Sequence, residues 1–224
     1  MRQEEPAWRR VTAAKDLEYR WPATVTVLVA VGIQLLLPET VTPQVRWVLP
    51  ALELAFLVVL VASDPVRISR RTIVARRAGL ALAAVVGVAN AWSVVLLVRA
   101  IVTGTSGDAP TLLLSGAGVW LTNVIAFALV FWELDRGGPA ARAHGEQDLP
   151  DFLFAQMQSP DLAPRDWEPH FVDYLFLAFT NATAFSPTDV LPMSRRAKLT
   201  MMLQSTVALA VTGFVVARAV NVLS

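Results

Sequence analysis

The residues best suited to chemistry lie in Phe171–Arg196, a short polar stretch within an apolar chain. Hydroxyls and amides at membrane depth need protein or water partners, because lipid offers none. The segment therefore predicts side chains that line a watery or protein-lined interior. The candidates are Thr180, Asn181, Thr183, Ser186, Thr188 and Asp189.

A second candidate is a pair of ionisable residues inside apolar runs, Glu53 and Arg99. Each lies about five residues from the outer end of its run, so at about 1.5 Å per residue their depths match. This predicts an intramembrane ion pair that joins two helices. The alternative is an ion-pathway or proton-relay role for Glu53.

Other kinds of site find little support in the sequence. The chain has no cysteine, and its two histidines, His144 and His170, have no neighbour at metal-ligand spacing. Motifs of hydrolases, zinc proteases and phosphate-binding loops are missing. We therefore expect no enzyme activity, no cofactor, no metal site and no nucleic-acid partner.

The composition places these residues in a membrane. Of the 224 residues, 55% are hydrophobic and 17% are charged, and the mean hydropathy is +0.52. That is too little polar surface to cover a soluble globule of this size. Runs long enough to approach a crossing of about 30 Å predict five spanning helices. They are Ala23–Leu37, Val45–Ser63, Ala78–Thr103, Pro110–Trp132 and Leu199–Leu223.

Basic residues set the predicted orientation. They collect in the N-terminal arm and in the loop after the second run, which should both be cytoplasmic, so the N-terminus is predicted to be cytoplasmic. These residues are Arg2, Arg9, Arg10, Lys15, Arg20, Arg67, Arg70, Arg71, Arg76 and Arg77.

The predicted organisation has four parts: a cytoplasmic arm (1–22), a four-helix membrane region (23–132), a hydrophilic loop (133–170) and a C-terminal part (171–224). In the loop, the sequence PDFLFAQM is either a short interfacial helix against lipid or bundle, or a plain linker. The acidic residues of the loop are predicted to be solvated. They are Asp148, Asp151, Asp161 and Asp166.

The segment Phe171–Phe185 is short for a crossing, since a helix of that length rises only about 22 Å. If it dips into the membrane and returns, the basic residues Arg195, Arg196 and Lys198 stay cytoplasmic. We therefore expect an all-α membrane bundle of five spanning helices plus one re-entrant segment, with a short sixth spanning helix as the alternative. Asp173 is expected to cap the segment or to pair with Arg195 or Arg196.

Two polar residues near mid-membrane, Asn90 and Asn123, are predicted to form hydrogen bonds between helices. Small residues in the same two runs should allow the helices to approach closely. They include Gly79, Gly87, Gly116 and Gly118.

The stretch Ala182–Pro192 resembles the pore helix and filter of potassium channels, with Thr183, Asp189 and Pro192 in matching places. In this resemblance Leu199–Leu223 corresponds to the inner helix. The channel filter has Gly-Tyr-Gly where this chain has Ser-Pro-Thr, and proline cannot adopt the backbone that those glycines allow. A potassium-selective filter is therefore not expected.

The last part of the chain also resembles predicted integral membrane proteins of bacteria that have no established activity. The similar motifs are FALVFWELDRGGP, DYLFLAFTNATAF, SRRAK and AVNVL. This resemblance implies a location in the bacterial inner membrane.

The sequence thus predicts a small homo-oligomeric protein of the lipid bilayer that forms a poorly selective ion channel through a degenerate pore loop. The alternative is a non-conducting scaffold or accessory subunit that binds a cytoplasmic protein partner through its hydrophilic loop.

Overall fold

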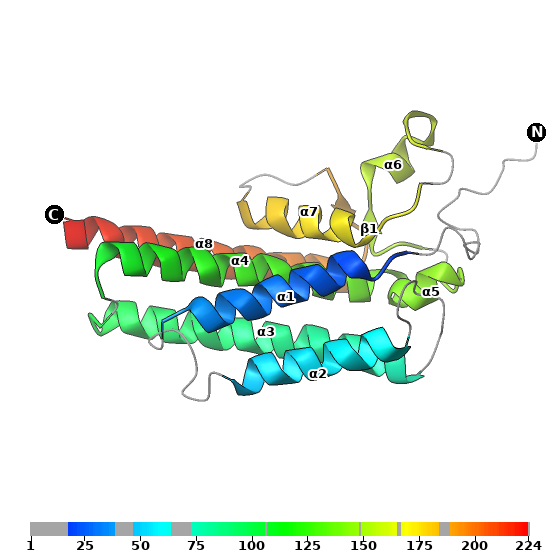
Figure 1. The fold of residues 1–224 in the computed structure, drawn as a ribbon. Coiled ribbons are helices and arrows are strands. Elements are labelled where there is room, and N and C mark those ends of the chain that lie inside the picture. Colours follow the sequence, from blue (N-terminus) through cyan, green and yellow to red (C-terminus); the bar gives the residue numbers. More distant parts are fainter. Residues whose placement is uncertain are drawn as a thin grey trace, which may run out of the picture.

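The computed structural model describes residues 18–38, 47–63, 73–105, 107–147, 149–164, 167–183 and 189–223. Its fold is helical, as predicted, and five long helices lie along one another (Figure 1). They are α1 (Trp21–Leu36), α2 (Val48–Ser63), α3 (Ile73–Val102), α4 (Ala109–Leu134) and α8 (Arg195–Leu223). Shorter elements connect α4 to α8. They are η2 (Asp135–Gly137), α5 (Pro139–Ala143), β1 (Phe152–Leu153), α6 (Ala155–Gln158), η3 (Pro160–Leu162), α7 (Phe171–Thr183) and β2 (Leu191–Pro192).

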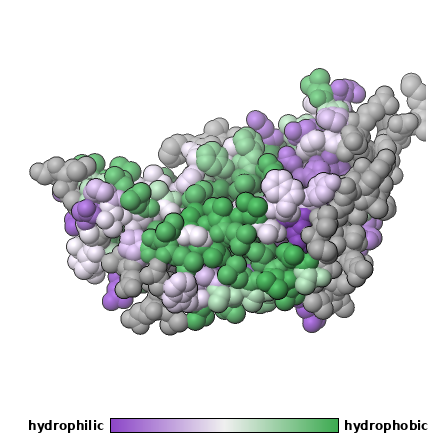
Figure 2. Space-filling view, in the orientation of Figure 1, coloured by the Kyte–Doolittle hydropathy of each residue, from purple (hydrophilic) through white to green (hydrophobic). Residues whose placement is uncertain are grey.

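Three helical stretches among the described residues are long and apolar enough to cross a membrane: Arg76–Val102, Ala109–Ala143 and Arg195–Asn221. The helices α1 and α2 are apolar but have only 16 residues each, fewer than the roughly 20 that a crossing needs. All five predicted runs are therefore helices, while three of them have the length of a span. Figure 2 shows a hydrophobic band across the middle of one face, with hydrophilic residues gathered toward one end.

The two ends of the bundle differ in charge. One end, here called the basic end, contains the starts of α1, α3, α7 and α8 and the end of α4 (Figure 1). The described basic residues at this end are Arg20, Arg76, Arg77, Arg136, Arg142, Arg195, Arg196 and Lys198. At the opposite end, the described basic residues are Arg99 and Arg218.

The short helix α7 begins at the basic end, and the chain returns to that end after it. The return is fixed by an antiparallel pairing of β2 with β1, in which Phe152 lies opposite Pro192 and Leu153 opposite Leu191. Helix α8 then starts directly from β2. With 13 residues, α7 rises about 20 Å and runs along only part of α4.

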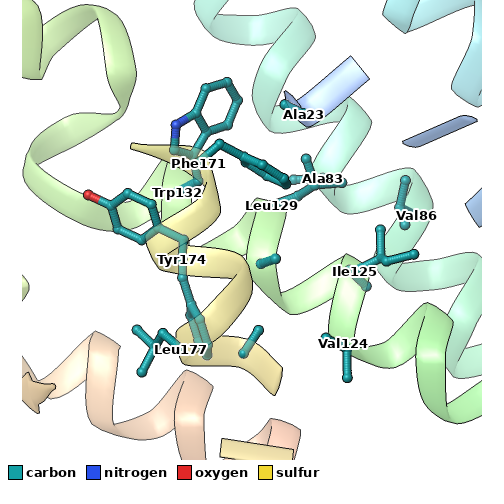
Figure 3. Packing of buried hydrophobic residues seen from close by; sticks show 14 of the residues in the cluster. Ala23, Ala83, Val86, Val124, Ile125, Leu129, Trp132, Phe171, Tyr174 and Leu177 are labelled. Atoms are coloured by element: carbon teal, nitrogen blue, oxygen red, sulfur yellow. The ribbon is translucent and has the colours of Figure 1, made fainter. Parts of the chain in front are cut away.

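Helix α4 is the centre of the packing, with α1, α3, α7 and α8 against it. One face of α7 buries Phe171, Tyr174 and Leu177 against α4 (Figure 3). The rings of Trp132 and Phe171 meet edge to face, with centroids 5.5 Å apart. The spacing of these buried residues, three apart, puts them on one stripe of α7 and explains which face packs.

Polar and small residues join the long helices as predicted. The Asn90 side-chain amide on α3 donates to the Asn123 side-chain oxygen on α4 at 3.1 Å, and Thr122 donates to the Asn90 oxygen at 3.0 Å. Gly116 on α4 lies against Val215 on α8. In contrast, Gly87 on α3 has no neighbour where a side chain would project.

These two glycines give a matched pair of substitutions. A Cβ at position 116 would lie 2.7 and 2.8 Å from the Val215 methyl carbons, whereas at position 87 nothing lies within 4 Å. We expect Gly116→Ala to lower the free energy of unfolding by about 1–3 kcal/mol through overpacking. Gly87→Ala should raise it by up to about 1 kcal/mol through helix propensity. Unfolding by denaturant in detergent measures both; equal effects would contradict the close α4–α8 contact.

Candidate functional site

The polar residues of α7 meet α8 through Asn181. Its side-chain amide donates to the Met201 carbonyl at 3.0 Å and to the Gln204 side-chain oxygen at 2.7 Å. In return, the buried Gln204 amide donates to the Ala178 carbonyl at 2.8 Å, and the Ser205 hydroxyl donates to the Asn181 carbonyl at 3.1 Å. These bonds fasten the C-terminal half of α7 to α8, and Gln204 was not among the predicted site residues.

The two threonines of α7 bond to their own helix. The Thr180 hydroxyl donates to the Phe176 carbonyl at 2.9 Å, and the Thr183 hydroxyl donates to the Phe179 carbonyl at 3.0 Å. Thr183 is exposed at the protomer surface and Thr180 is half-buried. Both hydroxyls are therefore satisfied without water or another helix.

Of the other predicted residues of this segment, the structure places Asp189. Ser186 and Thr188 lie outside the described residues. Asp189 is exposed, and it lies in a surface hollow with Gln158 and Ser159 of the region around α6. Within one protomer, the structure thus does not bring Asp189 together with the threonines.

The predicted ion pair between Glu53 and Arg99 is wrong. The partner of Glu53 is Gln34 on α1, whose side-chain amide donates to Glu53 Oε1 at 2.9 Å. Arg99 is exposed, and among the described residues no ion pair joins it to Glu53. The reason is that α3 extends well beyond the start of α2 (Figure 1), so equal residue counts from the helix ends do not give equal depths.

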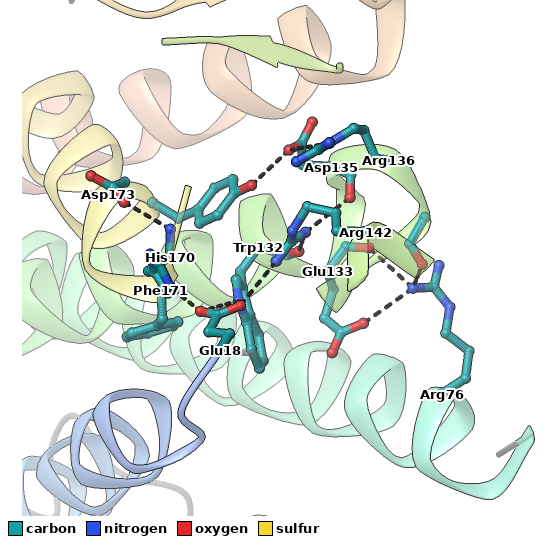
Figure 4. A network of polar contacts seen from close by, with 12 residues as sticks. Glu18, Arg76, Trp132, Glu133, Asp135, Arg136, Arg142, His170, Phe171 and Asp173 are labelled. Atoms are coloured by element: carbon teal, nitrogen blue, oxygen red, sulfur yellow. Dashed lines mark hydrogen bonds and ion pairs between the residues drawn. The ribbon is translucent and has the colours of Figure 1, made fainter. Parts of the chain in front are cut away.

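The densest group of polar contacts, which the sequence did not predict, lies at the basic end around Arg142 (Figure 4). The Arg142 guanidinium donates to the carbonyls of Trp132 and Asp135 at 2.6 and 2.9 Å, and it lies 3.5 Å from a Glu18 carboxylate oxygen. It also lies over the Tyr174 ring, 5.0 Å from the centroid. One side chain thus connects the end of α4 to the chain before α1 and to α7.

The Glu18 carboxylate has three partners. Besides its ion pair with Arg142, it accepts from the Trp132 indole N–H at 3.0 Å and from the Phe171 backbone N–H at the start of α7. Burial raises the pKa of Glu18, and the neighbouring Arg142 charge opposes that rise. The carboxylate therefore fixes the start of α7 as long as it has its basic partner.

A second carboxylate, Asp135, ties the hydrophilic loop to α7. It accepts from the backbone N–H groups of Asp151 and Phe152 at 2.7 and 3.3 Å, and from the Tyr174 hydroxyl at 2.6 Å. Asp135 is fully buried. The loop is therefore folded back onto the bundle at this point.

The expectation that Asp151 belongs to a solvated loop face is also wrong. Asp151 is buried, and both of its oxygens accept from the Arg196 guanidinium at 3.0 Å, while one accepts from the Arg136 backbone N–H at 3.1 Å. The two-point contact joins the loop to the start of α8. Asp173 caps α7 by accepting from the His170 backbone N–H at 2.8 Å, one of its two predicted roles.

The stretch PDFLFAQM packs against the bundle as β1 and α6, not as a single interfacial helix. Phe152, Phe154 and Met157 are buried in the core. The Phe154 ring meets the Tyr174 ring edge to face at 5.4 Å. Of the two predicted alternatives, contact with the bundle is confirmed and a plain linker is wrong.

A tight turn after α4 allows these contacts. Arg136, Gly137 and Gly138 have φ of 49°, 81° and 96°, and a Cβ at Gly138 would collide with the Arg76 guanidinium. That guanidinium donates to the Gly137 carbonyl and lies 3.4 Å from the Glu133 carboxylate. The turn thus brings the start of α3 against the end of α4.

The arrangement at the basic end is suited to holding segments in place. Each of Glu18, Glu133 and Asp151 has an arginine partner, and among the described residues no cluster of His, Asp and Glu could hold a metal ion. In comparisons with known proteins, no family model, curated protein or solved structure matches the chain.

Arg142 gives the sharpest test of this network. Arg142→Met leaves the Glu18 carboxylate without its counter-charge and removes a hydrogen bond from each of the Trp132 and Asp135 carbonyls, so we expect a loss of about 3–5 kcal/mol in the free energy of unfolding. The control Arg77→Met, at an exposed arginine of α3, should change it by about 0.5 kcal/mol or less. Similar losses for the two variants, measured by unfolding in detergent, would show that the network contributes little.

Proposed function

We propose that the chain is an integral membrane protein in which several copies assemble so that their α7 helices line a poorly selective ion-conducting path. The observation that supports this proposal is the geometry of α7. It is a half-length helix that begins at the basic end, and the chain returns to the same end before α8. In a bilayer this arrangement is a re-entrant segment between two spans, α4 and α8.

The surface of α7 supports an assembly of several copies. Val172, Phe176, Phe179 and Thr183 are exposed on it, at a spacing that puts them on one stripe. The opposite stripe is buried against α4, and Asn181 is bonded to α8. The exposed stripe, with Thr183 nearest the interior end of α7, is the face that another copy or water can reach.

The proposal includes an orientation of the protein in the membrane. The basic end carries most of the described arginines and lysines, which favours the cytoplasmic side and places the N-terminus there. With the bacterial resemblance, this favours the inner membrane. On this reading α1 and α2 also cross, and the bilayer is locally thinned around these helices of 16 residues.

Single cysteines test the orientation, because the chain has none of its own. Thr105→Cys lies at the end opposite the basic end, and Met193→Cys is exposed beside the start of α8. An impermeant thiol reagent added outside intact cells should label position 105 and spare position 193. Labelling of 193 alone would reverse the orientation. Labelling of both would mean that α7 crosses the membrane once, as a short sixth span, instead of re-entering.

Conduction is tested in liposomes with Thr183→Trp. Because Thr183 is exposed, the larger ring should not disturb the protomer, and we expect ion flux to fall by roughly tenfold or more if the path is narrow. The control is Val58→Trp, exposed on α2, which packs on α1 and α3 away from α7. Wild-type flux in both variants would refute a path along α7.

A second candidate function is a non-conducting scaffold that binds a cytoplasmic protein. It is favoured by Leu149 and Leu162 in the hydrophilic loop, which are 74% and 89% exposed. Absence of any flux from the assembled wild-type protein would favour this candidate.

A further inference from the structure

Glu53 is a buried carboxylate that the contacts at the basic end do not include. It lies in the second turn of α2 and is 0% exposed. Gln34, in the last turn of α1, donates to its Oε1 at 2.9 Å, and its Oε2 has no hydrogen-bond partner. The carboxyl group thus has a single, neutral partner.

The helices that pack on α2 bring no positive charge to this carboxyl group. Helix α1 contains no charged residue between Trp21 and Leu36. On α3, Arg76 pairs with Glu133 at the basic end, while Arg77 and Arg99 are exposed. Among the described residues, no ion pair reaches Glu53.

An ionised carboxylate in such surroundings is costly, because the desolvation penalty of several kcal/mol per ion is not offset by an opposite charge. The neutral acid avoids most of that penalty. It also matches its partner better, since an acid and an amide each offer one donor and one acceptor side by side. The acid can donate its proton to the Gln34 oxygen while accepting from the Gln34 amide nitrogen.

We propose that Glu53 is a proton-binding site, occupied by a proton in the resting protein and positioned by Gln34. The ligand is a proton and not a metal cation, because Ca²⁺ and Mg²⁺ need about six oxygen ligands, and Gln34 is the one polar partner of Glu53 among the described residues. The site is separate from α7, so this proposal does not depend on conduction.

The first test uses N,N′-dicyclohexylcarbodiimide, an apolar reagent that reacts with protonated carboxyl groups. The acid proton moves to a carbodiimide nitrogen and the carboxyl oxygen bonds to the central carbon; an acyl shift to nitrogen then gives a stable adduct. In the purified full-length protein at neutral pH, mass spectrometry should find at least about tenfold more adduct at Glu53 than at Glu133 or Glu18, because each of those two faces an arginine, whose charge favours the ionised form.

Two results of this test would oppose the proposal. Protection of Glu53 by Na⁺ but not by K⁺ at constant pH would assign the site to a metal cation. Equal labelling of Glu53 and Glu133 would show that the reagent reports exposure after local unfolding and not a bound proton.

The second test does not require the reagent to reach the site. Glu53→Gln replaces the neutral acid by an amide of the same shape, so the melting temperature should be unchanged at about pH 4, where the folded and the unfolded chain both carry this proton. As the pH rises above about 4–5, the wild type should lose stability, because the unfolded chain releases this proton while the folded chain still holds it. Glu53→Gln should lose less. A variant that melts below the wild type at every pH would mean that Glu53 is ionised and stabilising, which overturns the proposal.

Discussion

The contact on which the architecture depends most is the one between Arg142 and the end of α4. The last carbonyls of a helix have no partner within the helix, and burying them unpaired is costly. Here the Arg142 guanidinium donates to the carbonyls of Trp132 and Asp135, the second of which also accepts from the Gly138 backbone N–H, and it lies 3.5 Å from the Glu18 carboxylate. Because Glu18 in turn holds the first backbone N–H of α7, the starts of α1 and α7 are fixed relative to the end of α4.

Helix α7 shows why both of its ends need such anchors. A helix of 13 residues is marginal on its own, since nucleation is costly and few bonds follow. The basic-end contacts fix its start, and the bonds between Asn181 and Gln204 fix its last turns to α8. Between them, Tyr174 and Leu177 bury the apolar face. The polar residues that first suggested a lining thus serve in part to hold the helix, which leaves Thr183 as the one predicted residue that is exposed on α7.

The sequence was sufficient to predict the features of the fold that depend on the local pattern of residues. The five apolar runs became helices, and the amides at positions 90 and 123 meet because each lies near the middle of its helix. It was not sufficient where the partners are distant along the chain, as in the bond between Glu18 and Trp132, 114 residues apart. The acidic residues after α4 were predicted to be solvated, because the local sequence does not show that an arginine distant along the chain forms an ion pair with one of them. The ion pair between Glu53 and Arg99 was wrongly predicted because α3 extends beyond the start of α2 (Figure 1). Counting residues from the helix ends does not show this difference.

The carboxylates that form ion pairs at the basic end differ from Glu53 in what neutralises them. At the basic end, Glu18, Glu133 and Asp151 each face an arginine, and these arginines come from three different parts of the chain. Glu53, equally buried, faces an amide. Among the described residues, arginines face the carboxylates at the basic end and none faces Glu53, which leaves a small mobile cation to balance it. Of these, the proton alone needs no further ligands, and so it is the species that the geometry around Gln34 fits.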